Sequence, residues 1–426
     1  MKKVLVLSLV LVMALASSAF AAVNFSGDFT ATIENNGESF SSDLEVNNEF
    51  TVNIKASSES ENNWSFSAES SLDSTEFKLG KYKLELNDDY FDLYFWGNGF
   101  ELEDKGTTLG LIKAGKTASG NRARLVVDAI EPVTLTTDFT DNALYVFADA
   151  DVIENVTAGI AYRRAGESDE NVMSKDATNT IGVYGKGTVD MFTIEGDVAA
   201  TLGEEIALGY GAKVTVKPMD QLSASVSYVG TAKDFVGDTK ANISKVDASV
   251  TYTETDYRVK TTLAYDLKAD DDPVTVTAEA RYRFGQTLGF DDLFEDDKYF
   301  TNDAPAVGVS SEIANGGLDN VTLEVASPVV EDMIWARGVA KYAPKGEDHT
   351  FEVGAFGYIK ATEKLTVKPS VEFKSVDTVV TLRGIADYAI GSSDTTLSLE
   401  VAKNFYEEGA GVDPVELIKA SVKVGF

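Results

Sequence analysis

The chain has 426 residues, with 37 lysine and arginine against 69 aspartate and glutamate residues, so its formal net charge is −32. Such an acidic protein repels nucleic acid, and we expect no nucleic-acid partner. There is no cysteine, which excludes small disulfide-stabilised domains, cysteine nucleophiles and cysteine metal sites.

Residues 1–21 have the three parts of a secretory signal peptide. A basic start is followed by an apolar run from Val4 to Ala16, and small residues precede the expected cleavage after Ala21. The run is shorter than the ~20 residues of a membrane-spanning helix. Since no linker-like stretch divides the remainder, we expect residues 22–426 to form one exported domain.

From Val23 to Glu34, apolar and polar residues alternate, and the same alternation recurs between residues 44 and 56. A period of two is typical of a strand whose two faces meet different surroundings. Later segments repeat the pattern, and the short stretch 253–256 between two of them indicates an antiparallel hairpin. The clearest later segments are 246–252, 257–265, 274–282, 371–373, 397–401 and 418–426.

Roughly twenty candidate strands can be counted, many of them reaching the ~9–11 residues that a tilted strand needs to cross a bilayer. The apolar positions contain many small residues, which a lipid-facing surface tolerates better than a close-packed core. Several of these rows end in a tyrosine suited to the membrane interface. These interface candidates are Tyr162, Tyr228, Tyr252, Tyr265, Tyr282 and Tyr388.

The last strand carries apolar residues at alternate positions up to a terminal phenylalanine. If it pairs with the first strand, both sheet edges disappear, which removes unpaired backbone groups from the hydrocarbon. The pattern resembles the assembly signal of bacterial outer-membrane β-barrel proteins, which their insertion machinery reads, and the whole chain looks like a porin. The residues of this barrel-closing signal are Ile418, Ala420, Val422, Val424 and Phe426.

The predicted fold is therefore all-β: a closed antiparallel transmembrane β-barrel of about 16–20 strands, with 18 as the central value at ~20–24 residues per strand and connection. The resemblance implies the outer membrane of a diderm bacterium, contact with its lipid and barrel-assembly machinery, and a possible homotrimer. Residues 100–116 are similar to the glycine-rich hairpin before the constriction loop of general porins. The segment that follows is short, which leaves open whether this loop folds inward.

Charged side chains on the polar face are expected to line the pore. They predict a modest cation preference, because rings of charge in a low-dielectric wall bias which ions enter. A basic cluster at residues 113–124 has three interpretations: a transverse field, an anionic-solute site, or pairing with nearby loop acids. The pore-lining candidates are Lys113, Lys116, Arg122, Arg124, Glu34, Glu45, Glu49, Arg258, Lys260, Glu279 and Arg281.

Catalysis is not expected. The single histidine, His349, lies in a polar stretch that reads as a loop, and no nucleophile-elbow motif occurs. The acidic run at 291–297 lacks calcium-loop spacing and reads as a solvated external loop, with a divalent-ion site as the alternative.

The predicted function is thus a water-filled porin for passive diffusion of small hydrophilic solutes and ions, with no cofactor. The competing interpretation is an exported cell-surface or adhesin-like protein made of β-sandwich domains without a pore. The sequence does not identify the solute.

Overall fold

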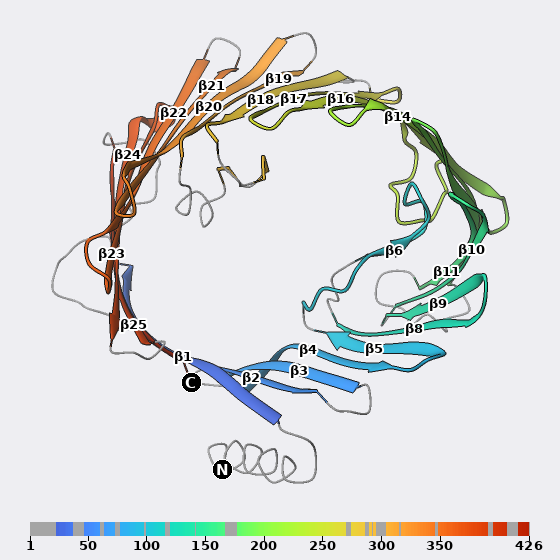
Figure 1. Cartoon of the computed structure of the whole chain (residues 1–426), viewed down its shortest axis with the longest axis horizontal. Helices are drawn as coiled ribbons and strands as arrows, with labels where there is room; N and C mark the ends of the chain where they lie inside the picture. The colour runs from blue at the N-terminus through green and yellow to red at the C-terminus, as the bar shows by residue number, and fades with distance from the viewer. Residues whose placement is uncertain are drawn as a thin grey trace.

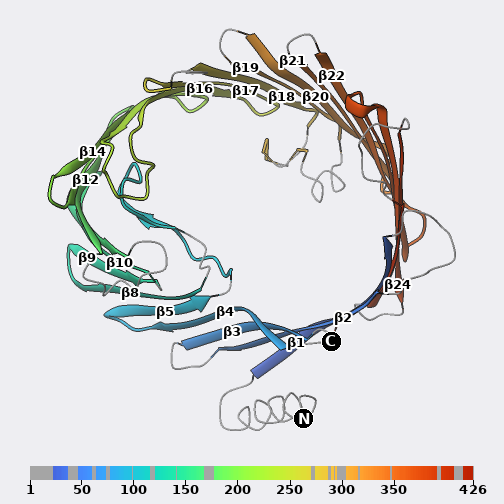
Figure 2. The ribbon, with the colours of Figure 1, turned by 180° about the vertical axis from the view of Figure 1, so that it is seen from behind.

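Twenty-four strands of the computed structural model form one antiparallel sheet that curves into a ring (Figures 1 and 2). Each strand pairs with the next in the chain, β5 pairs with β8, and β1 pairs with both β2 and β26. The structure describes residues 23–36, 47–59, 64–72, 77–97, 99–115, 120–140, 142–166, 177–269, 274–285, 289–291, 293–294, 304–314, 317–345, 348–390, 395–406 and 416–425.

All but two of the ring strands have 9–14 residues, about the length that a tilted strand needs to cross a bilayer once. Their bounds are β1 Val23–Asn36, β2 Asn47–Glu59, β3 Trp64–Leu72, β4 Phe77–Asn87, β5 Phe91–Gly97, β8 Asn121–Ile130, β9 Val133–Phe139, β10 Ala143–Ile153, β11 Val156–Ala165, β12 Thr178–Val189, β13 Phe192–Leu202, β14 Ala207–Met219, β15 Leu222–Thr231, β16 Ser244–Thr253, β17 Tyr257–Asp266, β18 Val274–Arg283, β19 Ala306–Ala314, β20 Gly317–Val330, β21 Ile334–Lys345, β22 Asp348–Lys360, β23 Leu365–Lys374, β24 Val379–Ile390, β25 Thr395–Phe405 and β26 Glu416–Gly425.

The predicted all-β antiparallel fold is confirmed, but the central estimate of 18 strands was too low, because the ring has 24. The estimate allotted about 20–24 residues to each strand with its connection. Many connections are much shorter than that allotment assumed, such as the two-residue turn 190–191 between β12 and β13. The same length of chain therefore makes more crossings.

Strand β26 closes the ring, as the alternation before the chain end predicted. Its residues pair with β1, with Val422 opposite Ala31 and Ala420 opposite Ile33, and on its other side β26 pairs with β25. Each strand of the ring therefore has a hydrogen-bonded neighbour on both sides, which leaves no open edge. Phe426 and the expected signal peptide at 1–21 lie outside the described residues.

A single closed sheet contradicts the alternative of packed β-sandwich domains, which requires two facing sheets. The only other sheet in the described residues is a small hairpin inside the ring, made of β6 Lys105–Gly106 and β7 Lys113–Ala114. Among the described residues, no helix is long and apolar enough to cross a membrane.

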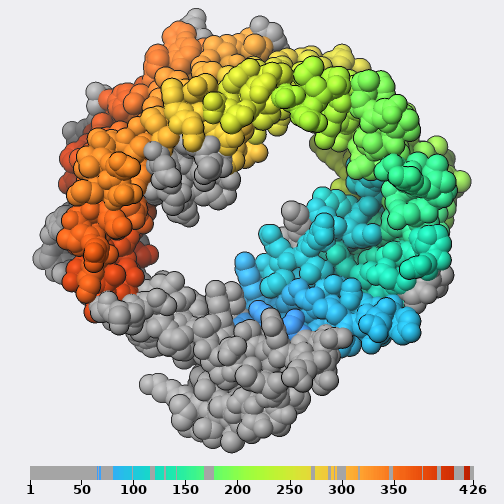
Figure 3. Space-filling model, viewed as in Figure 1, coloured from blue at the N-terminus to red at the C-terminus, as the bar shows by residue number. Residues whose placement is uncertain are grey.

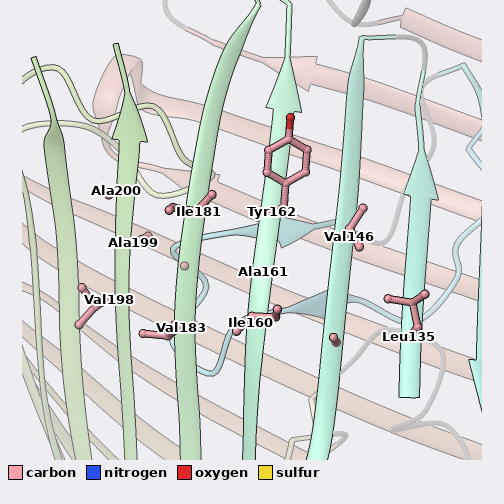
Figure 4. Close-up of a pocket in the computed structure, with 12 residues that line it drawn as sticks. Leu135, Val146, Ile160, Ala161, Tyr162, Ile181, Val183, Val198, Ala199 and Ala200 are labelled. Carbon is pink, nitrogen blue, oxygen red and sulfur yellow. The ribbon is translucent and has the colours of Figure 1, made fainter. Parts of the chain in front are cut away.

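The outward face of the ring carries exposed large apolar side chains. On β13, Ile194 and Val198 are 58% and 51% exposed, whereas Asp197 and Ala199, which alternate with Val198, are buried on the inner face. Figure 4 shows the same outer face across β9–β13, where residues such as Ile160 and Val183 line a shallow apolar groove. A continuous apolar exterior on a closed sheet is the surface that hydrocarbon covers.

The six predicted interface tyrosines lie on this outer face in two groups. Tyr162, Tyr228 and Tyr265 lie toward one end of their strands, and Tyr252, Tyr282 and Tyr388 toward the other. Aromatic neighbours accompany some of them: Tyr210 lies 5.8 Å from Tyr228, and Phe284 lies 4.5 Å from Tyr282, between ring centroids.

The two ends of the ring differ in the length of their connections. At one end, the connections β2–β3, β4–β5, β8–β9 and so on have two to four residues, with a single exception, the 22 residues 284–305 between β18 and β19. The opposite end carries the other long connections, including residues 98–120 between β5 and β8 and residues 232–243 between β15 and β16.

Candidate functional site: the lumen and its inner loops

The ring encloses a lumen (Figures 1 and 2), and among the described residues the connections β5–β8, β15–β16 and β18–β19 fold into it. We call residues 99–115, which include β6 and β7, the first inner loop. We call residues 284–305 the second inner loop, of which 284–285, 289–291, 293–294 and 304–305 are described. Figure 3 shows the ring hollowed at its centre, with the first inner loop projecting into the hollow. The two loops enter from opposite ends.

The first inner loop packs on the inner wall of β10–β15 through apolar side chains. Leu111 and Ile112 are fully buried, in a cluster with Tyr145, Phe147 and Phe235. Burying a leucine or isoleucine side chain contributes about 1.5–3 kcal/mol. The loop is therefore a fixed part of the lumen, and the porin-like hairpin recognised in the sequence does fold inward.

Glycines on the inner wall make room for this docking. A Cβ added at Gly182 would lie 3.1 Å from Ile112 Cδ1, and one at Gly211 would lie 2.8 Å from Leu109 Cδ1. A side chain at either position would crowd these two side chains of the loop, since interiors are close-packed.

Both ends of the first inner loop are fastened by a buried cluster of charged residues. Asp138 is fully buried and accepts hydrogen bonds from Arg122 Nε at 2.7 Å and Arg124 Nε at 2.8 Å. Arg122 also donates to the carbonyl of Gly115, and Arg124 to the carbonyl of Glu103. Both guanidinium groups lie over the ring of Trp96, which is itself buried.

Two further carboxylates hold the middle of the first inner loop. Asp197 of β13 accepts hydrogen bonds from the Thr108 hydroxyl and from the Leu109 amide, the latter at 2.8 Å. Asp238 accepts one from the Lys113 amide at 2.7 Å and one from the Tyr145 hydroxyl at 3.0 Å.

Asp238 belongs to the connection 232–243, which supports the first inner loop from the side. Its amide donates to the Leu111 carbonyl, and the neighbouring Thr239 hydroxyl donates to the Gly110 carbonyl. Burial raises the pKa of the Asp238 carboxyl, although Arg163, 3.5 Å away, opposes the effect.

The second inner loop is anchored differently, by aromatic rings and arginines. Phe290, Leu293 and Phe294 are buried against Ala306 and Ala326. The guanidinium of Arg283 lies 4.5 Å from the Phe290 ring centroid, and that of Arg281 5.7 Å from the Phe294 ring centroid. Such cation–π contacts are worth roughly 0.5–2 kcal/mol each.

An exposed ion pair completes this anchor. Arg258 Nη2 lies 2.7 Å from Asp291 Oδ1, and the side chain of Asp291 is 82% exposed. The hydrogen bond from Arg258 lowers the pKa of Asp291. The acidic run that the sequence placed in an external loop therefore begins, at Asp291, inside the ring. Within the described residues, no group of acidic or histidine side chains could hold a metal ion.

The pore-lining candidates have different positions. Arg258, Lys260, Glu279 and Arg281 lie together on the inner face of β17 and β18. Lys113 belongs to the first inner loop and pairs with Asp104 at 2.8 Å.

Arg122 and Arg124 face inward but are buried beneath the first inner loop. Contrary to the expectation from the sequence, they therefore do not line the water-filled space. The interpretation in which they pair with acids is the one that the geometry favours, although the acid is Asp138 of the wall. Glu34 and Glu49 lie in β1 and β2, whose backbone alone is described, and Lys116 and Glu45 lie outside the described residues.

His349 is not in a loop. It lies in β22, where its Nδ1 is 2.9 Å from the Tyr342 hydroxyl, and the two rings stack. The sequence analysis predicted neither this placement nor the anchoring role of Phe290, Leu293 and Phe294. The available signal for the anchor was the presence of three large apolar residues within an acidic segment.

Elsewhere on the inner face, cations of neighbouring strands are engaged by carboxylates. Arg337 pairs with Glu324 at 2.9 Å and Arg383 with Glu400 at 2.6 Å. Lys368 pairs with Asp387 at 3.1 Å. These cross-strand pairs neutralise basic side chains on the inner wall.

No family model and no curated protein matches the sequence. Solved structures do match the fold. The translocation pore of the P pilus usher PapC is 8% identical with a TM-score of 0.50, covering 95% of this chain and 99% of that one. This protein has the fold of an outer-membrane β-barrel.

A P pilus tip assembly intermediate of E. coli containing PapC matches at 9% identity with a TM-score of 0.58, covering 95% of this chain and 61% of that one. The siderophore receptor PirA from Pseudomonas aeruginosa is 10% identical with a TM-score of 0.48, covering 95% of this chain and 80% of that one. The apolar exterior and the fold together agree with the expected location, the outer membrane of a diderm bacterium.

Proposed function

We propose that this protein is a porin-type channel through which small hydrophilic solutes and ions diffuse passively across the outer membrane. The observation that carries the proposal is a closed ring with an apolar exterior, a polar inner face and a hollow centre (Figure 3). The short-turn end is the periplasmic end, because outer-membrane barrels have short periplasmic turns.

The two inner loops set the width of the channel. A ring of 24 strands, about 4.7 Å apart and tilted by about 40°, has a backbone diameter of roughly 45 Å. An unobstructed lumen of that size would pass large molecules. The first and second inner loops narrow it from opposite ends, so we propose that they decide which solutes pass.

The channel prefers cations in this proposal. Inner-wall cations such as Arg337 and Arg383 already pair with carboxylates. The chain as a whole has 69 acidic and 37 basic residues, so unpaired negative charge predominates. A negative potential in a low-dielectric wall raises the local concentration of cations.

Reconstitution into planar bilayers tests the proposal. In a potassium chloride gradient we expect stable single-channel currents and a reversal potential whose sign indicates cation preference. Folded protein without conductance would contradict the channel, and a reversal potential of the opposite sign would contradict the cation preference alone.

A second candidate is polypeptide translocation, favoured by the fold similarity to the PapC usher pore. Liposomes containing this protein distinguish the two candidates. The porin proposal predicts entry of mono- and disaccharides but exclusion of large dextrans. Entry of dextrans would favour the translocation pore.

The proposal also includes three expectations from the sequence, which concern processing, membrane insertion and oligomeric state. They are removal of residues 1–21 on export, insertion by the barrel-assembly machinery, and assembly into a homotrimer. Cross-linking of the purified protein in detergent, followed by mass determination, tests the trimer.

A further inference from the structure

A patch of positive charge lies on the inner wall beneath the second inner loop. Arg258 and Lys260 of β17 and Arg281 and Arg283 of β18 lie on the same face of paired strands, with Arg258 opposite Arg281. The chain has nearly twice as many acidic as basic residues, so a group of four neighbouring basic side chains is not expected by chance.

Part of this patch is held in place by the wall itself. Glu279 bridges two of the arginines, with Oε1 2.8 Å from Arg258 Nη2 and Oε2 2.8 Å from Arg281 Nη2. These three side chains are 13–23% exposed. The arrangement therefore depends on strand residues and remains when the loop residue above it changes.

A carboxylate of the chain shows what the patch binds. Asp291 Oδ1 lies 2.7 Å from Arg258 Nη2, while the rest of the Asp291 side chain faces solvent. The positive charges of Arg281 and Lys260 also act on it and help to lower its pKa. An exposed carboxylate on a preformed guanidinium has the geometry of a bound solute.

A small polar pocket adjoins the patch. Its volume is about 210 Å³, and Lys260 and Glu279 form one side. The hydroxyls of Thr262, Thr277 and Ser310, the amide of Asn320 and the carboxylate of Glu312 also line it. Such a mixture of donors and acceptors suits a molecule that carries several hydroxyl groups. No carboxylate of the described residues lies within ion-pair distance of Lys260, so its ammonium group is available to a solute.

We infer that this patch and pocket form a binding subsite for a hydroxylated monocarboxylate of the sugar-acid class. The solute carboxylate takes the place of Asp291 on Arg258, next to Lys260, and its hydroxyl groups enter the pocket. Asp291 is then a built-in competitor that keeps the subsite weak. This inference rests on the proposed channel function and names one class of solute for it.

The charges of the subsite favour one negative charge on the solute. Glu279 and Glu312 flank the pocket, so a second negative charge at the end of the solute that enters the pocket meets repulsion, whereas uncharged hydroxyl groups there do not. Neutral sugars lack the carboxylate that the guanidinium of Arg258 would bind.

The test measures how gluconate reduces potassium chloride current through single channels in planar bilayers. The variants are Asp291→Asn, the double variant Asp291→Asn with Lys260→Gln, and Arg383→Gln as a control arginine in another inner-wall ion pair. Glucose, propionate and phosphate serve as comparison solutes. Heat-modifiable migration on gels verifies that each variant is folded.

We expect Asp291→Asn to increase the apparent affinity for gluconate roughly tenfold, because a tethered competitor acts at a millimolar effective concentration. The double variant should lose this gain, and Arg383→Gln should match the unmodified protein. Glucose, propionate and phosphate should each bind more weakly than gluconate to Asp291→Asn.

Equal gluconate affinity in all variants, or glucose binding as strong as gluconate binding, would overturn the subsite while leaving the channel intact. Stronger binding of phosphate than of gluconate would show a general anion site and overturn the sugar-acid assignment. Absence of any potassium current in folded protein would instead remove the channel function itself.

Discussion

The two inner loops occupy one lumen but are held by different forces. The first is docked by fully buried apolar residues and by buried carboxylates such as Asp138. The second combines a small apolar cluster with an ion pair whose carboxylate, Asp291, is largely exposed. Breaking a buried charge pair strongly destabilises a protein, whereas an exposed pair contributes little to stability. We therefore expect the first loop to stay docked in the lumen, and the contact of Asp291 in the second loop to be the one that a solute displaces.

The largest effect should come from Asp138→Ala. It leaves Arg122 and Arg124 buried without their shared carboxylate, and removing one partner of a buried pair costs about 3–5 kcal/mol. We expect the first inner loop to leave the wall, with a lower denaturant midpoint for the folded barrel and a larger conductance. Asp387→Ala, which breaks the more exposed pair with Lys368, is the control. Equal losses in the two variants would contradict the special role of the buried cluster.

Truncating one buried leucine in each loop should show that the two loops are attached to the wall independently. Leu111 and Leu293 are both fully buried, and a buried leucine-to-alanine change costs about 2–5 kcal/mol. Hydrogen exchange should accelerate at residues 107–112 in Leu111→Ala and at 289–294 in Leu293→Ala. Faster exchange at both loops in either single variant would show that they are coupled, against their independent attachment.

Asp291→Asn should have a small effect on stability, since exposed ion pairs contribute about 0–1 kcal/mol. The denaturant midpoint should hardly change, while the conductance should fluctuate more because the second inner loop is less firmly held. The same fluctuation should appear in the unmodified protein at high salt, which screens exposed charges. A large loss of stability would mean that the second loop is as firmly built in as the first.

Lowering the pH should destabilise the second inner loop and stabilise the first, and this effect should be smaller than those of the substitutions above. The pKa of Asp291 is lowered by its hydrogen bond from Arg258, so its stabilisation is present at neutral pH and is lost as the pH falls through that lowered value. The pKa of Asp238 is raised by burial, so its contribution is full below its ordinary value and declines as the pH rises through the raised value.

Hydrogen exchange of the two loops between about pH 3 and pH 7 measures this difference after correction for the intrinsic rate. Acid should increase opening of the second loop relative to the first. The Asp291→Asn variant, which lacks the titrating group, should show a smaller change at the second loop. The reverse order would contradict the assignment of the pKa shifts to these contacts.

Much of the barrel could be read from the sequence because a strand in a bilayer has two faces with different solvents. The alternation from Val23 and the alternation before Phe426 identified β1 and β26 and their closure. The number of strands could not be predicted as well, since two-residue turns such as 190–191 carry little signal and leave the boundaries between strands uncertain.

The interior was harder to predict because its contacts join residues far apart in the chain. Arg122 and Arg124 appeared as a basic cluster, and only the paired strand β9 brings Asp138 between them. Likewise, an acidic run reads as solvated unless the arginines of β17 and β18 are known to lie beneath its first residue, Asp291.

The central claim is that hydrocarbon covers the outer face and water fills the lumen, and single cysteines test it most directly because the chain has none of its own. In liposomes, a membrane-impermeant charged maleimide should modify a cysteine replacing Lys213, on the inner face beside Glu195, and should reduce the current. It should not modify one replacing Val198, on the outer face. Rapid modification at 198 with protection at 213 would contradict the account.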